Sequence, residues 1–237
     1  MRIVLTRPRN DSERTAAALR AHGHAVLIAP LLRIETLPVK LDQRYGAVVI
    51  TSGNAAAALA DHPACAALTA LPLYAVGKRS ADAARDAGFS DIHVAGGDAG
   101  DLVRLIAEQK PDANAPLLYL AGEDRSVDLG GELAMHGIAV ELAVIYRAVP
   151  QPFPAVLLAA LADQAVDAVM HFSKRSAAQY VTGARQAGIA EAALGVRHLC
   201  LSAQVAAPLR EAGAARVDVA KRPDESAMVA LIEQAAS

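Results

Sequence analysis

Short apolar runs alternate with longer mixed stretches along the whole chain. The runs RIVLT (residues 2–6) and AVVIT (residues 47–51) are examples, and each is followed by a stretch rich in alanine or charged residues. Short apolar runs are typical of buried strands, and longer stretches with spaced charges are typical of helices. Strands that alternate with helices form parallel sheets with crossover helices. The pattern therefore predicts an α/β protein.

Glycines mark the ends of several predicted helices. Glycine is common just after a helix, because it adopts the left-handed backbone conformation that closes the last turn. The glycines expected in this role are Gly23, Gly88, Gly137 and Gly213.

The second half of the chain repeats the order of the first half. The repeat unit is much longer than that of a solenoid protein, so it indicates a duplicated set of strands and helices. We therefore expect two similar lobes. The matching segments are 2–33 with 117–147, 45–59 with 166–180, 73–95 with 198–220, and 98–108 with 224–234.

Two proline-containing segments interrupt this pattern at equivalent places in the two halves. They read RIETLPVK (residues 33–40) and YRAVPQPFP (residues 146–154), and proline favours extended backbone around it. If both segments cross between lobes, one lobe contains both chain ends, and a cleft lies at the crossing. The expected division is a first lobe of residues 1–35 and 152–237, a second lobe of residues 41–145, and extended linkers at 36–40 and 146–151.

Composition excludes several classes of function. The chain has 237 residues, of which 54% are hydrophobic and 20% charged, so it can bury large cores. The net charge is −2 and aromatic residues make up only 3%. Such a chain has no basic field for nucleic acid or for an anionic membrane, and few rings for base stacking. We expect neither nucleic acid nor a membrane as a partner.

The N-terminal sequence and the apolar runs predict a cytoplasmic protein. The apolar run after Met1 is too short for a signal peptide, and Arg7 and Pro8 interrupt it. The longest apolar run, AVLIAPLL, is far shorter than a membrane-spanning helix. The two cysteines form no CxxC pair, which favours structural thiols. The seven histidines are scattered, which favours surface positions over metal ligation.

Polar residues follow the predicted strands, where a parallel sheet binds its ligands. Serine and asparagine at these places are also the usual N-terminal caps of helices. Two explanations therefore stay open: capping alone, or a shared site for an anionic ligand at helix N-termini. No glycine-rich phosphate motif is present, which disfavours nucleotides. The candidate ligand-binding residues are Arg7, Ser52, Gly53, Asn54, Lys78, Ser80, Gly122, Arg125, Ser173, Lys174, Ser202 and Gln204.

Tyr146 is the candidate catalytic residue. The internal repeat aligns it with Leu32, so packing alone does not require a phenol at this position. A tyrosine hydroxyl can donate a proton or a hydrogen bond to a leaving group. The alternative is an ordinary tyrosine at a solvated boundary.

The chain resembles uroporphyrinogen-III synthases over essentially its full length. No single segment is diagnostic, but the order and spacing of the segments are fairly specific. The matching segments are VLTRP, ITSGNAAAAL, LYAVGKRSADAARDAG, LAGEDRSVDLGGELAMHGIAVELAVIYRA, HFSKRSAAQYV and CLSAQVAAPLREAG.

This resemblance implies both a fold and a reaction. It implies two flavodoxin-like α/β lobes with parallel sheets, joined by two extended linkers, with a cleft between the lobes. It also implies cyclisation of hydroxymethylbilane, a linear tetrapyrrole with many carboxylates, with inversion of ring D and loss of water. Enzymes of this family use no cofactor and no metal, and they act as monomers in tetrapyrrole and haem biosynthesis.

The resemblance also suggests roles for individual residues. The family tyrosine proposed to help the hydroxyl leave matches Tyr146, and hydroxyl-bearing turns of the family match Ser52, Ser80 and Ser173. The last such turn often carries threonine in the family, whereas this chain offers Ser202 and Gln204 there. The cations Lys78, Lys174 and Arg125 are candidate partners of substrate carboxylates.

Two other interpretations remain open at this point. A cytoplasmic two-lobed protein could bind an anionic small molecule without catalysis, although many such binding proteins act outside the cytoplasm. A degenerate homologue could keep the fold without the activity. Retention of Tyr146 and of the paired polar turns speaks against such a loss.

Overall fold

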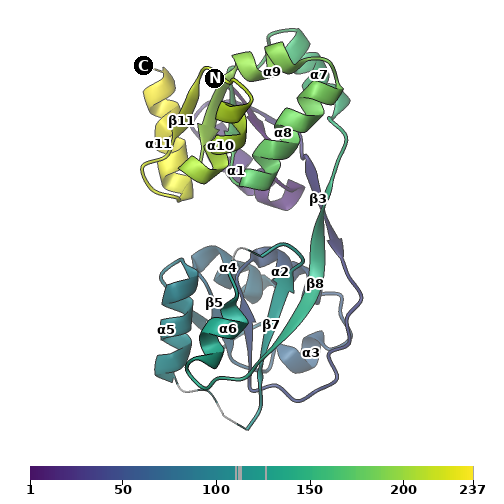
Figure 1. Ribbon diagram of the computed structural model, residues 1–237, viewed down its shortest axis with the longest axis vertical. Helices are drawn as coiled ribbons and strands as arrows, with labels where there is room; N and C mark the ends of the chain where they lie inside the picture. Colours follow the sequence, from purple (N-terminus) through teal and green to yellow (C-terminus); the bar gives the residue numbers. More distant parts are fainter. Residues whose placement is uncertain (110, 112–113, 126, 237) are drawn as a thin grey trace. The chain divides into compact units, whose positions relative to one another are not determined.

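The chain folds into two compact α/β units. The computed structural model describes residues 1–109, 111, 114–125 and 127–236. Unit 1 contains Met1–Arg33 and Val149–Ser237, and unit 2 contains Ile34–Ala148. In each unit helices cover both faces of one central sheet (Figure 1). The predicted fold class, two α/β lobes built on parallel sheets, is confirmed.

Unit 1 has a parallel sheet of five strands in the order β11-β10-β9-β1-β2. The strands are β1 (Arg2–Leu5), β2 (Ala25–Ile28), β9 (Ala168–His171), β10 (Arg197–Cys200) and β11 (Val217–Val219). The helices are α1 (Arg9–Ala21), α7 (Ala155–Ala162), α8 (Lys174–Gln186), α9 (Ala190–Gly195), α10 (Ala203–Glu211) and α11 (Glu225–Ala236).

Unit 2 is built on the sheet with the order β3-β8-β7-β4-β5-β6. The strands are β3 (Leu32–Thr36), β4 (Ala47–Ile50), β5 (Leu73–Ala75), β6 (Ile92–Val94), β7 (Leu117–Gly122) and β8 (Val140–Pro150). The helices are α2 (Gly53–Leu59), α3 (Cys65–Leu68), α4 (Lys78–Asp86), α5 (Ala99–Gln109) and α6 (Leu129–Ala134). The strands from β8 to β6 are parallel.

Strand β3 differs from the others because it runs antiparallel to β8. Backbone N–H groups of Leu37 and Gln151 donate to the carbonyls of Ile145 and Leu31, so residue numbers rise on one strand as they fall on the other. Most of the segment 146–151, expected to be a linker, therefore lies within β8. Its proline at position 150 stands at the end of the strand, where a missing N–H group is tolerated.

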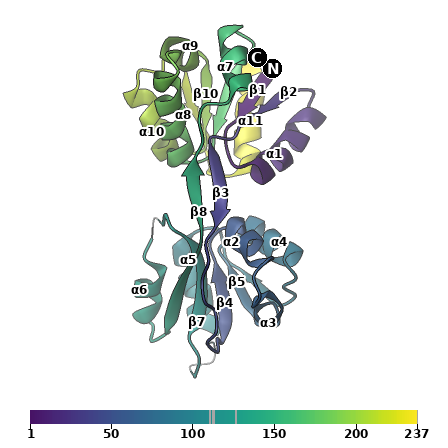
Figure 2. The same cartoon turned by 90° about the vertical axis from the view of Figure 1, so that its right-hand side faces the viewer.

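The two strand orders become the same when the repeat is taken into account. Unit 1 reads β2-β1-β9-β10-β11, which is the flavodoxin-like order 2-1-3-4-5. The repeat matches β7 with β1, β4 with β9, and β5 with β10, so β8-β7-β4-β5-β6 gives the same order. Unit 2 is therefore a circular permutation of the unit 1 topology. Figure 2 shows the sheet of each unit from a second direction.

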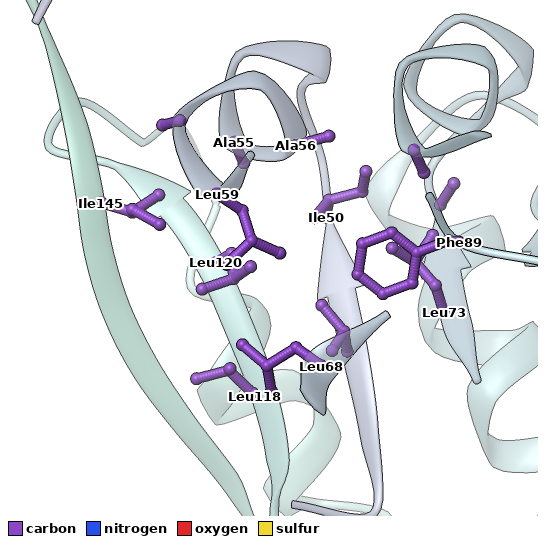
Figure 3. Close-up of a cluster of buried hydrophobic side chains, with 14 of the residues drawn as sticks. Ile50, Ala55, Ala56, Leu59, Leu68, Leu73, Phe89, Leu118, Leu120 and Ile145 are labelled. Carbon is purple, nitrogen blue, oxygen red and sulfur yellow. The ribbon is translucent and has the colours of Figure 1, made fainter. Parts of the chain in front are cut away.

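Each sheet has a hydrophobic core on both faces. In unit 2, α2 and α4 pack on one face, where Ile50, Leu118 and Leu120 of the strands are fully buried against Leu59 of α2 (Figure 3). Helices α5 and α6 pack on the other face. In unit 1 one core contains residues of α7, α8, α9 and α10, and the other contains residues of α1 and α11. Burial on both faces explains why the strands read as continuous apolar runs.

All four glycines expected at helix ends have the predicted conformation. Their φ angles are positive, as the left-handed region requires, at +80° in Gly23, +101° in Gly88, +73° in Gly137 and +93° in Gly213. In the described part of the chain, no helix is long and apolar enough to cross a membrane. The described side chains also form no group of three or more His, Cys, Asp or Glu suited to a metal ion.

The expectation that the histidines lie on the surface is wrong for His171 and His198. Both are fully buried in unit 1, where Nε2 of His171 lies 3.1 Å from Nδ1 of His198. The ring of Tyr180 meets both imidazoles edge-on, and its hydroxyl donates to the carbonyl of Ala193. Both histidines belong to strands that are buried on both faces, so their side chains enter the core.

Burial makes these two histidines sensitive to acid. It lowers the pKa of His198 to about 4, with a smaller contribution from the charge of Arg216, and it lowers the pKa of His171 well below 6.5, with a contribution from His198. The unfolded chain protonates both histidines below about pH 6.5, whereas the native state resists protonation. Their contribution to stability is therefore complete above pH 6.5 and is lost as the pH falls toward 4.

We predict that the free energy of unfolding falls as the pH drops from about 7 to about 5, by up to about 1.4 kcal/mol per pH unit for each buried histidine. His198→Gln should make this slope shallower, because one titrating group is removed. Urea unfolding at several pH values measures the slope. His136→Gln, at an exposed position, serves as the control, and an unchanged slope in His198→Gln would contradict the assignment.

Candidate functional site

The strand order of unit 2 reverses between β4 and β7. From β4 the chain continues through β5 to β6 on one side, and then returns to place β7 on the other side of β4. In open α/β sheets a crevice forms beside such a reversal, at the carboxyl ends of the strands, because the flanking connections leave on opposite faces. A ligand site in unit 2 is expected at this edge.

A pocket of about 490 Å³ lies at this edge of unit 2. This volume is typical of small-molecule sites. Its walls come from the chain just after β4, β5, β6 and β7, and from Tyr146 of β8. The lining residues are Thr51, Ser52, Val76, Gly97, Asp98, Ala99, Tyr119, Gly122, Asp124, Arg125, Val127, Leu129 and Tyr146.

Tyr146, the predicted catalytic residue, lies against the backbone of Gly122 at the edge of this pocket. The two residues are paired across β7 and β8. A methyl group on Gly122 would lie only 2.7 Å from Cζ and 2.9 Å from Oη of Tyr146. The phenol therefore occupies space that any other residue at position 122 would fill. Tyr146 is partly exposed and lines the pocket.

Arg125 holds the turn that follows β7. Its Nη1 donates to the carbonyl of Gly122 over 2.9 Å and to that of Glu123 over 3.2 Å. The N–H group of Glu123 in turn donates to the carbonyl of Tyr146. Arginine has five N–H donors, so a guanidinium that binds two carbonyls retains others for an anion.

Hydroxyl groups line the part of the pocket next to β4. Oγ1 of Thr51, just after β4, lies 2.9 Å from Oη of Tyr119 within β7, which joins the two strands. Oγ of Ser52 accepts from the N–H group of Asn54 over 3.2 Å and caps α2. The capping explanation for Ser52 is therefore confirmed, and the same residue also lines the pocket.

The sequence did not point to Tyr119 or Asp98. Tyr119 lies inside an apolar run, and its hydroxyl meets that of Thr51 because β4 and β7 are neighbours. Asp98 follows β6 and accepts from the N–H group of Asp101, in the first turn of α5. The segment DIHVA (residues 91–95) precedes Asp98 and is a short, mostly apolar run, so the polar residues after it could have been included in the same way as those after β4.

Four other predicted residues of unit 2 do not line the pocket. Gly53 allows α2 to approach α4, since a methyl group there would lie 3.0 Å from Cβ of Ala83. Asn54 is partly buried at the start of α2. Lys78 is exposed at the first position of α4, whereas Ser80 is buried on the inner face of the same helix.

Arg7 of unit 1 is largely buried among protein groups. Its side chain is 7% exposed, and its guanidinium lies 3.7 Å from Asp11 and 4.0 Å from Glu225. Cζ also lies 4.3 Å from the centre of the Phe172 ring. These contacts join the end of β1 to α1 and α11, so the placement favours a structural role in unit 1.

The remaining predicted residues lie at helix starts in unit 1. Oγ of Ser173 accepts from the N–H group of Ser176, and Oγ of Ser202 accepts from that of Val205, so both serines are N-terminal caps. Lys174 and Gln204 follow these caps and are exposed. Because β9 and β10 are neighbours, the two caps follow adjacent strands of the unit 1 sheet.

Comparisons with known proteins point to one family. The model of the family described as HEM4, uroporphyrinogen-III synthase HemD, matches residues 13–230. No curated protein matches the chain. The crystal structure of a uroporphyrinogen-III synthetase from Helicobacter pylori is 20% identical, covers 99% of both chains and gives a TM-score of 0.65. A mutant uroporphyrinogen III synthase from Thermus thermophilus is 21% identical, covers 100% of this chain and 98% of its own, and gives 0.56.

We predict that Ser52→Ala lowers the free energy of unfolding by about 1 kcal/mol, because the N–H group of Asn54 loses its acceptor at the start of α2. Urea unfolding monitored by circular dichroism measures the change. Ser90→Ala, at an exposed loop position of the same unit, should change stability by less than about 0.5 kcal/mol. Equal effects in the two variants would show that the cap contributes nothing.

Proposed function

The chain belongs to the uroporphyrinogen-III synthase family, and on this premise we propose that Tyr146 donates the proton with which water leaves the substrate at the pocket of unit 2. Members of this family are cyclising lyases of haem biosynthesis, and this chain is one of them. The family match supports this reading and does not support a binding protein without catalysis.

The substrate we propose is hydroxymethylbilane. It carries acetate and propionate groups on four pyrrole rings, so it needs both cationic partners and a place for the reacting ring. The pocket volume of about 490 Å³ is that of a site for a drug-sized ligand, which suits part of the tetrapyrrole. Lys78 and Arg125 are two of the cationic side chains at the strand ends of unit 2, where they can pair with carboxylates of the substrate.

Besides the guanidinium of Arg125, the pocket offers groups that suit a pyrrole ring. Asp98 and Asp124 contribute two acceptors, and the hydroxyls of Tyr119 and Thr51 add neutral polar groups. Pyrrole N–H groups are donors, and the ring becomes cationic when the hydroxyl leaves. Carboxylates near such a ring favour the charge that develops there.

The proposed first step breaks the bond between the terminal carbon and its hydroxyl. The Tyr146 phenol gives its proton to the departing oxygen, which leaves as water, and the pyrrole nitrogen supplies the electron pair that forms the azafulvene cation. General acid catalysis of this kind contributes typically 10²–10⁴-fold to a rate. The proton that ring D releases when it regains aromaticity at the end of cyclisation is available to restore the phenol.

The later steps depend on positioning. The azafulvene is attacked by the substituted carbon of ring D, and the resulting spiro intermediate fragments and closes again with ring D inverted. These intermediates are reactive by themselves, so the protein has to hold ring D in place and exclude closure without inversion. Orientation of two reacting groups accounts for a large part of many enzymatic rate enhancements.

A coupled assay tests the proposed substrate. Hydroxymethylbilane is generated in situ, the purified full-length chain is added, and the oxidised porphyrins are separated by chromatography. We expect mostly the type III isomer with the protein and the type I isomer in the blank. Only type I porphyrin in both reactions would contradict the proposed substrate.

We predict that Tyr146→Phe lowers kcat for type III product by about 10²-fold, because the leaving hydroxyl loses its proton donor. Stability should change by less than about 1 kcal/mol, because the ring remains in place and only the phenolic hydroxyl is lost. Tyr74→Phe is the matched control: Tyr74 is buried in the same unit but does not line the pocket. Full activity in Tyr146→Phe with an intact fold would remove the phenol from the mechanism.

We also propose that the protein acts as a cytoplasmic monomer, which is what its family membership suggests. Sedimentation equilibrium at micromolar protein concentration, compared with the chain mass of 24.5 kDa, tests the oligomeric state. Cell fractionation tests the location. A stable dimer, or recovery of the protein outside the cytoplasm, would contradict the respective part.

A further inference from the structure

The pairing of β7 with β8 contains an irregularity beside Tyr146. Ala121 pairs with Val144, but the next residue of β7, Gly122, pairs with Tyr146. Ile145 is therefore an extra residue on β8, as in a β-bulge. Both Ile145 and Tyr146 consequently contact the same hydrophobic core, whereas neighbours on a regular strand point to opposite faces. The bulge thus turns Tyr146 onto the face where Gly122 lies.

Gly122 leaves the space that the turned phenol occupies. A methyl group at this position would come within 2.7 Å of Cζ, 2.9 Å of Cε2 and 2.9 Å of Oη of Tyr146. The φ angle of Gly122 is not in the left-handed region, so the backbone conformation does not require glycine here. The contact with the ring is what restricts position 122.

Under such a clash the ring of Tyr146 moves, whereas the paired strands keep their positions. The three close atoms are at the outer end of the Tyr146 side chain, which rotates about its own bonds. The backbone of Gly122 is held by the pairing with β8 and by Arg125, which binds its carbonyl over 2.9 Å. A side chain at position 122 therefore displaces the hydroxyl while the strands stay paired.

We propose that Gly122 is a positioning residue for the reaction: with the bulge of β8 on one side and Arg125 on its carbonyl, it fixes the place of the Tyr146 hydroxyl. This role differs from the direct substrate contact that the sequence suggests for Gly122. The inference rests on the proposed function, because it assumes that the Tyr146 phenol acts in the reaction.

A double-mutant cycle tests the inference. The four proteins are the wild type, Gly122→Ala, Tyr146→Phe and the double variant, each as the full chain. For each one, kcat and KM for type III product are measured in the coupled assay, and stability is measured by urea unfolding. If Gly122 acts only through the phenol, its substitution matters only while the hydroxyl is present.

We expect Gly122→Ala to lower kcat by about tenfold to a hundredfold with little change in KM, because displacement of a catalytic group by about 1 Å can cost a factor of this size. In the Tyr146→Phe background the same substitution should lower kcat by less than about twofold. Equal factors in the two backgrounds would overturn the proposal, since the effect would then not pass through the hydroxyl.

Two further measurements keep the proposal falsifiable. Gly130→Ala is the matched control, since a methyl group there has only an ordinary contact of 3.6 Å, and it should leave kcat unchanged. If Gly122→Ala prevents folding, the sheet rather than the ring has given way, and the proposal is wrong. Wild-type protein that forms only type I product, or full activity in Tyr146→Phe, would overturn it together with the proposed function.

Discussion

The reversal of strand order between β4 and β7 determines where unit 2 can bind a ligand. A parallel sheet wound in two directions has one place where neighbouring connections leave on opposite faces, and the carboxyl ends of the strands open there. The pocket occupies this place, and its polar groups come from loops that are far apart in the sequence. The hydrogen bond between Thr51 and Tyr119 links β4 and β7 beside the pocket. The chemistry of the site therefore depends on a topological constraint before it depends on any one side chain.

Of the groups at the pocket, the Tyr146 phenol is the one that lies against the backbone of Gly122. The pocket combines acceptors, hydroxyls and a guanidinium, and hydrogen bonds hold Thr51, Asp98 and Arg125 against neighbouring protein groups. Cyclisation of a tetrapyrrole through reactive intermediates needs little covalent help from the protein and much control over geometry. A pocket edge that holds a phenol in a fixed place fits this requirement. The caps Ser173 and Ser202 show that unit 1 has the same kind of edge, whereas the repeat places Leu32 where the second half has Tyr146.

Much of this arrangement could be predicted from the sequence. The repeat of strands and helices predicted both sheets, and polar residues after strands led to Ser52, Gly122 and Arg125. The contact between Gly122 and Tyr146 could not be predicted, because it depends on a bulge that shifts the register by one residue. Tyr119 was missed for a similar reason, since its partner Thr51 is 68 residues away. Ser80 does not line the pocket, and helical spacing explains why, because it puts Ser80 on the same buried face of α4 as Ala84.

The discontinuity of unit 1 has a consequence for synthesis on the ribosome. Its central strand pair joins Ile3 to Ala168, so β1 has no β9 partner until most of the chain has been made. Unit 2, which ends at Ala148, is complete well before that point. Domains form as their residues emerge, and pairing of distant segments is slow. Unit 2, which is inserted between the two segments of unit 1, can therefore fold first. The N-terminal strands β1 and β2 lack their neighbour β9 until the C-terminal third of the chain has been made.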